Sequence, residues 1–163
     1  MRKKVAVLMG SKSDLPKLED CLLTLKNLNL ETEVRVMSAH RTPEIVSAFA
    51  SQAEANGFGV IIAAAGGAAH LAGVVAAHTL LPVIGIPIEN GAFKGLDALL
   101  STVQMPGGIA VATVGVGNGG AMNAALLAAQ IIALSDNELR QGLVADRAAR
   151  KAKVIQADQE LQP

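Results

Sequence analysis

The chain has 163 residues, of which 51% are hydrophobic and 17% are charged, and its 14 acidic and 14 basic side chains balance. This composition predicts an ordered globular protein of about one domain and argues against a disordered chain. The zero net charge and the presence of only three Phe, with no Tyr or Trp, argue against a nucleic-acid-binding protein.

The N-terminal segment "MRKKVAVLMG" has basic residues before an apolar run, as a signal peptide does. The run ends at Gly10 and is shorter than the h-region of about 7–15 residues that a signal peptide needs, so it predicts a first strand. The single cysteine, Cys21, has no partner for a disulfide or a metal site and is expected to be a small apolar residue on a helix. We therefore predict a cytoplasmic protein.

Apolar runs predict five strands, at residues 5–9, 32–37, 60–65, 82–88 and 109–116. Helical patterns lie between them, at residues 14–29, 42–57, 68–79 and 95–105. Strands that alternate with helices predict crossover connections and a parallel sheet. The expected fold class is α/β, a three-layer sandwich with the flavodoxin-like strand order 2-1-3-4-5.

The segment Asn56–Ile88 contains no Asp, Glu, Lys or Arg and resembles a membrane span in composition. Glycines, histidines and prolines interrupt it, however, whereas a bilayer span needs about 20 consecutive apolar residues. Parallel strands covered on both faces are also continuously apolar, so a buried strand, turn, helix and strand are predicted here.

The chain is expected to be helical after the fifth strand. Residues 121–134 are apolar nearly all round, which predicts burial on more than one side, and residues 136–162 form a charged amphipathic helix. Self-association would cover these faces, so we predict a homo-oligomer; the alternative is a long exposed terminal helix. We expect a single domain, 1–163, with an α/β core at 1–135 and a helical extension at 136–163.

Ligands of open parallel sheets bind outside the carboxyl ends of the strands, near the switch point between strands 1 and 3. The first strand is followed by "GSKSD", which places Ser11, Ser13 and Asp14 at a helix N-terminus, where free N–H groups attract anions. The alternative is that Ser13 or Asp14 only caps the helix. Asp14 would repel a phosphate and suits a sugar hydroxyl better.

Two more strand ends contribute to the same predicted crevice. "SAHRTP", residues 38–43, follows the second strand, and "AAGGAAHLAG" follows the third and brings Gly66, Gly67 and His70. The two glycines lack side chains and would let a flat ligand approach the backbone. We expect Thr42 to cap the next helix and Pro43 to occupy its first position. A phosphorylated small molecule with a planar part suits this crevice.

The chemistry of two neighbouring side chains indicates an enzyme. Arg41 offers a fixed fork of donors to phosphate or carboxylate. His40 can accept and donate a proton near neutral pH, and its position beside an arginine in a strand-end turn favours catalysis over a structural role. No Ser-His-Asp arrangement and no Cys/His cluster for a metal is recognisable. His78 is expected to be a core or interface residue.

The stretch "GVGNGG" has the G-x-G-x-x-G spacing of a dinucleotide-binding loop. That fingerprint also requires a following strand with an acidic residue about 20 positions on, and only helix is predicted after Gly120. These glycines are expected instead to let the fifth strand and its helix, or a neighbouring subunit, pack closely.

Six motifs in order, "VLMGSKSD", "SAHRTP", "AGGAAHL", "LPVIGIPI", "VQMPGG" and "NAALLAAQI", give a resemblance that covers nearly the whole chain. The chain resembles the class I N5-carboxyaminoimidazole ribonucleotide mutase family of purine biosynthesis. The resemblance implies a flavodoxin-like homo-octamer that moves a carboxylate from the exocyclic nitrogen to C4 of aminoimidazole ribonucleotide, without cofactor or metal. It also implies site roles: His40 as general acid/base, Ser11, Asp14, Ser38 and Arg41 at the phosphoribosyl part, and Gly66, Gly67 and His70 around the base and the migrating carboxylate.

Two alternatives stay open. Relatives of the animal type, which use free carbon dioxide directly, have Lys-Gly where this chain has Arg41-Thr42, so the sequence favours the mutase over a direct carboxylase. A non-catalytic phosphoribosyl or nucleotide sensor would need Arg41 but not a proton-transfer residue. Ala72 and Ala110 stand where relatives often have proline. This difference puts the rate of the reaction in question, but not the identity of the enzyme.

Overall fold

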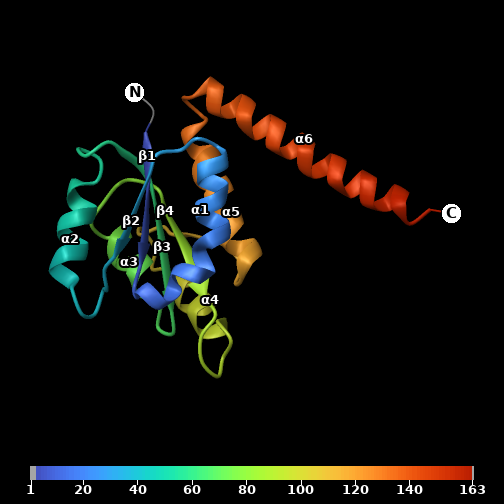
Figure 1. Cartoon of the computed structure of the whole chain (residues 1–163). Helices are drawn as coiled ribbons and strands as arrows, with labels where there is room; N and C mark the ends of the chain where they lie inside the picture. The colour runs from blue at the N-terminus through green and yellow to red at the C-terminus, as the bar shows by residue number, and fades with distance from the viewer. Residues whose placement is uncertain (1–2, 163) are drawn as a thin grey trace.

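The computed structural model of the chain describes residues 3–162 and shows a central parallel sheet with helices on both faces (Figure 1). The strands run in the order β2-β1-β3-β4-β5, which confirms the predicted fold class and topology. Their bounds are β1 (Lys4–Met9), β2 (Thr32–Val36), β3 (Phe58–Gly66), β4 (Val83–Ile88) and β5 (Ala112–Thr113).

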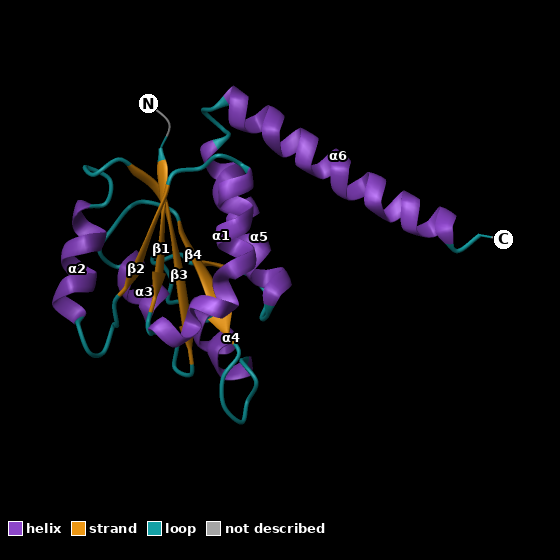
Figure 2. Cartoon of the chain, in the orientation of Figure 1, coloured by secondary structure: helices purple, strands orange, loops and turns teal. Residues whose placement is uncertain are grey.

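The helices divide between the two faces of the sheet (Figure 2). They are η1 (Lys12–Leu18, a 3₁₀ helix), α1 (Glu19–Asn27), α2 (Pro43–Gln52), α3 (Leu71–Ala76), α4 (Leu96–Val103), α5 (Asn118–Ile132) and α6 (Asn137–Glu160). Successive strand residues point to opposite faces. Val5 and Val7 of β1 therefore join the core under α1 and α5, whereas Ala6 and Leu8 join the core under α2 and α3.

The uncharged segment Asn56–Ile88 contains β3, α3 and β4, as predicted. Every residue of β4 is buried, because helices cover it on both faces. Gly85 shows how close this packing is, since a Cβ there would collide with Thr102 of α4. Within residues 3–162, no helix is both long and apolar enough to cross a membrane.

Four predicted elements differ clearly in extent from those observed, and one of them is the helix predicted at 42–57, which ends at Gln52. The strand predicted at 109–116 is only Ala112–Thr113, because it pairs with β4 alone at the sheet edge and glycines flank it on both sides. The helix predicted at 14–29 is divided into η1 and α1, and Pro16, which has no N–H to donate, lies inside η1. The helix predicted at 68–79 shortens to α3, because Gly67 and Ala69 have left-handed backbones.

The C-terminal helices leave apolar side chains exposed in the single chain. Helix α5 buries a face of small residues such as Ala121, Ala125 and Ala129, whereas Leu126 and Leu127 are only partly buried. The expectation that this helix is buried on more than one side is therefore met only in part within one chain. Helix α6 extends away from the sheet (Figure 1), and Leu139 is its only buried residue in the described chain.

Candidate functional site

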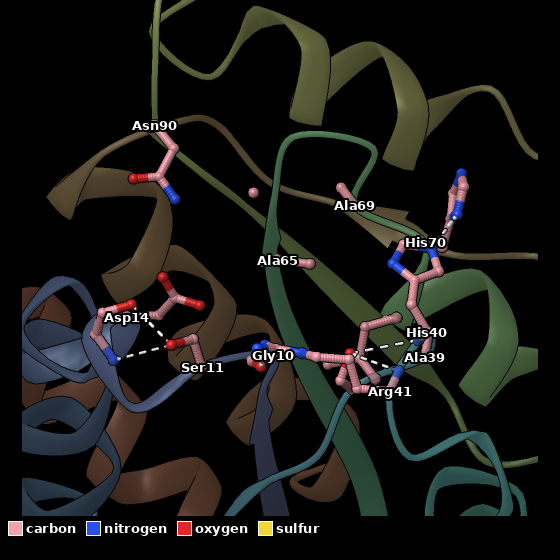
Figure 3. Close-up of a pocket in the computed structure, with 14 residues that line it drawn as sticks. Gly10, Ser11, Asp14, Ala39, His40, Arg41, Ala65, Ala69, His70 and Asn90 are labelled. Carbon is pink, nitrogen blue, oxygen red and sulfur yellow. Dashed lines mark hydrogen bonds between the residues drawn. The ribbon is translucent and has the colours of Figure 1, made fainter.

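A cavity of about 430 Å³ opens at the carboxyl ends of the strands, on both sides of the β1/β3 switch point (Figure 3). Four loops supply its walls, those that follow β1, β2, β3 and β4. Among its lining residues are seven of the eight predicted site residues, namely Ser11, Asp14, Ser38, His40, Arg41, Gly66 and His70. Gly67 lies in the adjoining turn and does not line the cavity, and its role as a binding residue stays a prediction.

The loop after β2 is held in shape by its own hydrogen bonds. The Thr42 hydroxyl accepts from the Ser38 N–H at 2.9 Å and donates to the Ser38 carbonyl at 3.2 Å. Ser38 Oγ in turn accepts from the backbone N–H groups of His40 and Arg41, at 3.3 and 3.2 Å. Helix α2 begins at Pro43 as predicted, but the prediction that the Thr42 side chain caps it is wrong, because that hydroxyl closes the loop instead.

His40 and His70 meet across the cavity, although they come from different loops. His40 Nε2 lies 2.6 Å from His70 Nδ1, and the two rings are nearly perpendicular, with an interplanar angle of 83°. One hydrogen lies between the two nitrogens, so one ring donates and the other accepts. Both side chains are exposed to the cavity, and a proton held by one ring can be passed to the other or to a ligand.

Arg41 bridges two of the loops. Its Nη2 donates to the carbonyl oxygen of Gly10 at 2.9 Å, which fixes the guanidinium beside the end of β1. That bond uses one of the five N–H donors of an arginine, so the rest of the fork is available to an anion. The position of Arg41 beside the end of β1 suits a phosphate.

The loop after β1 contributes Ser11 and Asp14. Ser11 is the N-cap of η1 and its Oγ accepts from the N–H of Ser13 at 3.3 Å, so neither alternative cap, Ser13 or Asp14, has that role. Asp14 is only 5% exposed, and this burial raises the pKa of its carboxyl, an effect opposed by the charge of Lys17 and by a hydrogen bond from the Ser11 backbone. A polar ligand group could satisfy this carboxyl.

The glycines after β3 have different effects. A Cβ on Gly66 would lie 2.9 Å from Asn90 Nδ2, so the absent side chain leaves room for the Asn90 amide rather than for a ligand alone. Gly67 has a φ of +63° and open space around its Cα, which allows the turn that leads to His70. Ala69 also adopts a positive φ, +47°, a conformation that costs an L-residue about 1 kcal/mol.

Asn90 lines the cavity but is not among the site residues that the sequence predicts. It follows β4 by two residues, so the rule that ligands bind at the carboxyl ends of strands could have identified it. The close packing predicted for the "GVGNGG" stretch is seen at Gly120, where a Cβ would collide with the backbone of Gly115. A Cβ on Gly115, Gly117 or Gly119 would meet no atom within 4 Å, and the alternative of a neighbouring subunit stays a prediction. His78 lies outside the cavity and is exposed in the single chain, so the expectation of a core residue is wrong and the interface alternative stays a prediction.

The acidic, histidine and cysteine side chains of the described residues do not cluster as metal ligands do. Over residues 3–162, no group of three or more His, Cys, Asp or Glu side chains comes together in a way that could hold a metal ion. The groups that do converge are an arginine fork for an anion, a buried carboxyl, and a pair of imidazoles that can transfer a proton. Acid/base chemistry on a small anionic ligand suits this arrangement.

The family model described as AIR carboxylase matches residues 4–153. The chain belongs to the AIR carboxylase family. Among relatives in this family, the N5-carboxyaminoimidazole ribonucleotide mutase of Escherichia coli (strain K12) is 51% identical over 153 residues, which cover 94% of this chain and 90% of that protein. The protein of the same name from Bacillus subtilis (strain 168) is 47% identical and covers 99% of both chains.

The fold of the family is seen in a solved structure as well. The crystal structure of Treponema denticola PurE superposes with a TM-score of 0.89 at 33% identity, over 99% of this chain and 100% of that one. The AIR carboxylase relationship thus extends over the sheet, the cavity loops and most of α6.

Proposed function

We propose that this chain is an N5-carboxyaminoimidazole ribonucleotide mutase, an isomerase of purine biosynthesis. The observation that carries the proposal is the 2.6 Å contact between His40 and His70 in a cavity that also holds Arg41 and Asp14. Relatives about half identical to this chain have that name, which supports the same reaction here. A cavity of about 430 Å³ is within the range of small-molecule sites.

The proposed reaction breaks one C–N bond and forms one C–C bond. The carboxylate leaves the exocyclic nitrogen as carbon dioxide, and that nitrogen gains a proton. C4 of the ring then attacks the same carbon dioxide, and the proton on C4 must leave to restore aromaticity. The net result is an isomerisation in which one proton moves from C4 to nitrogen, so no oxidant, reductant or other co-reactant is needed.

His40 is the proposed general acid/base for both proton transfers. Its contact with His70 supports this role, because the shared hydrogen bond orients the His40 ring and gives its proton a second acceptor. Ser11, Asp14, Ser38 and Arg41 are proposed to bind the phosphoribosyl part, and Gly66, Gly67 and His70 to surround the base. Confinement of carbon dioxide beside the ring replaces a high reactant concentration, and the small apolar side chains of Ala39, Ala65 and Ala69 limit water there.

The test supplies each substrate separately to the purified wild-type chain. We expect rapid conversion of N5-carboxyaminoimidazole ribonucleotide to the C4-carboxylated isomer in buffer without added bicarbonate. Efficient conversion only from aminoimidazole ribonucleotide and bicarbonate would overturn the mutase in favour of a direct carboxylase. Tight ligand binding with no turnover of either substrate would indicate a non-catalytic binding protein.

We further propose that the chain works as a homo-oligomer, specifically an octamer. Support comes from the apolar side chains that a single chain leaves exposed, which include Leu96, Leu100 and Val103 on one side of α4 and Val154 and Ile155 on α6. A second copy of the chain would bury them. Light scattering under native conditions should give about eight times the 16.7 kDa chain mass, and a monomer mass would refute the assembly.

A further inference from the structure

The Asn90 side chain occupies the side of the cavity away from the two histidines (Figure 3). It reaches the cavity from the loop after β4, whereas the other polar lining residues come from the loops after β1, β2 and β3. Asn90 has no part in the proton transfers described above. Its place among the cavity walls therefore calls for a function of its own.

Lys17 fixes the orientation of the Asn90 amide. Lys17 Nζ donates to Asn90 Oδ1 at 3.0 Å and also to the backbone carbonyl of Glu89. Because an ammonium group has donors and no acceptor, it must face the oxygen of the amide and not its nitrogen. Asn90 Nδ2 is thereby turned away from Lys17, over Gly66 and toward the cavity (Figure 3).

Lys17 also connects Asn90 with Asp14. It lies three residues after Asp14 on η1, and its charge acts on the Asp14 carboxyl by lowering that group's pKa against the effect of burial. The result is an amide donor, Asn90 Nδ2, and a carboxyl acceptor, Asp14, on the same side of the cavity (Figure 3). A hydroxyl group can both donate and accept, so it can satisfy this pair.

We propose that Asn90 is a substrate-binding residue whose Nδ2 donates a hydrogen bond to a ribose hydroxyl that in turn donates to Asp14, and that Lys17 is the positioning residue that orients the amide. The proposal rests on the proposed function in one respect, that the ligand is a ribonucleotide. It adds the loop after β4 to the binding site. It also explains why residue 66 is a glycine, because a side chain there would displace the Asn90 amide.

The first test measures binding directly. Loss of one neutral hydrogen bond should weaken binding of aminoimidazole ribonucleotide to the Asn90→Ala chain by about 2- to 10-fold, measured by calorimetry. Asn90→Asp should weaken binding more, because it replaces the donor by a second acceptor near Asp14. Asn56→Ala, a matched change at an exposed position in the turn before β3 and outside the cavity, should leave the Kd unaltered.

A wild-type Kd in the Asn90→Ala chain would overturn the proposal. Failure of the proposed function is distinguishable, because it would appear as a wild-type chain that does not isomerise its substrate, whereas the Kd comparison needs no turnover. Circular dichroism and thermal melting of each variant would show that a weakened Kd does not come from unfolding.

The ribose hydroxyl and the role of Lys17 each have their own test. The Kd of two substrate analogues, one without the 2′-hydroxyl and one without the 3′-hydroxyl, is measured for the wild-type chain and for Asn90→Ala. One analogue should have the same Kd for both chains, because the hydroxyl that the amide contacts is already absent from it. If Asn90→Ala weakened the binding of both analogues equally, the assignment of Asn90 to a ribose hydroxyl would be overturned. Lys17→Met should raise the Kd and Lys17→Arg, which retains donors only, should restore it; a wild-type Kd in Lys17→Met would overturn the positioning role.

Discussion

His40 Nε2 and His70 Nδ1 are 2.6 Å apart although 30 positions separate the residues in the chain. The contact joins the loop after β2 to the loop after β3, and both loops are fixed independently of it. The Ser38–Thr42 hydrogen bonds hold the first loop, and the Gly67 and Ala69 backbones turn the second toward the cavity. The imidazole pair is therefore positioned before a ligand binds.

Replacement of either histidine should separate proton transfer from binding. His40→Asn should lower kcat by about 10²- to 10⁴-fold, the usual contribution of a general acid/base, with the Kd for aminoimidazole ribonucleotide within about threefold of wild type. His70→Asn should lower kcat less and alter its pH profile, because His40 loses its hydrogen-bonding partner. His78→Asn, outside the cavity, is the control, and unchanged turnover in His40→Asn would remove this residue from the mechanism.

Asp14→Asn should weaken substrate binding without destabilising the fold. Burial raises the pKa of the Asp14 carboxyl, so the folded chain holds this proton more tightly than the unfolded chain does. The contribution of this group to stability therefore falls as pH rises from the ordinary carboxyl range through the raised pKa. At pH 7 the Asn variant, which has no carboxyl to ionise, should melt at the wild-type temperature or above it.

The same substitution should raise KM by about 10- to 100-fold, the cost of losing a hydrogen bond to a charged acceptor. Thermal melts between pH 3 and pH 8 and steady-state kinetics measure the two effects. The matched control is Asp158→Asn, an exposed position on α6. A clear fall in melting temperature at pH 7 would contradict the proposed effect of burial.

Lysine at position 41 should not restore the binding of an anionic substrate that arginine provides. Lysine retains the charge but lacks the planar fork, and it could not bind the Gly10 carbonyl and an anion in the same geometry. We expect KM to rise about tenfold or more in Arg41→Lys and further in Arg41→Met, with the comparison made at constant ionic strength. Arg147→Met, exposed on α6, is the control, and a wild-type KM in Arg41→Met would exclude an anion contact.

Gly66→Ala should disturb the cavity through Asn90. The new methyl group would lie 2.9 Å from Asn90 Nδ2 and 3.3 Å from the Ile88 carbonyl, which belongs to the rigid sheet. Overpacking of this kind costs about 1–3 kcal/mol, and we expect a lower melting temperature together with a higher KM. In an Asn90→Ala background the cost should be smaller, because one of the two close contacts is gone; equal costs in both backgrounds would contradict this explanation.

Cys21 should be inert to thiol reagents in the folded chain. Burial raises the pKa of its thiol to about 12, and the reactive species is the thiolate. Labelling by a colorimetric disulfide reagent should therefore be slow in buffer and rapid above the denaturation midpoint in urea. Fast labelling of the native protein would mean that α1 opens readily from the sheet.

The topology and most of the cavity residues could be predicted because they depend on chain-local patterns. Apolar runs gave the strand positions, and the carboxyl ends of β1, β2 and β3 led to Ser11, His40 and His70. Nothing in the sequence gives the distance between two side chains, so the His40–His70 contact could not be derived from the motifs alone.

Other features depended on competition between local partners. The Thr42 hydroxyl can cap α2 or close its own loop. It closes the loop, because the backbone N–H and carbonyl of Ser38 lie within hydrogen-bonding distance of it. Gly66 suggested space for a ligand, whereas the structure fills part of that space with Asn90, a residue more than twenty positions away. The short β5 reflects its single neighbour in the sheet, which a run of apolar residues does not reveal.

In the proposed oligomer, the helical content of α6 would depend on protein concentration. An isolated helix in water is marginal, and most helical stability in proteins comes from tertiary packing. This 24-residue helix has its Asp136 cap and the Arg150 contact with Met122, but Leu139 is its only buried residue among those described. When the proposed oligomer is diluted until it separates into single chains, the C-terminal turns of α6 should unwind while the sheet persists. The helical content and the particle mass in solution should therefore fall together.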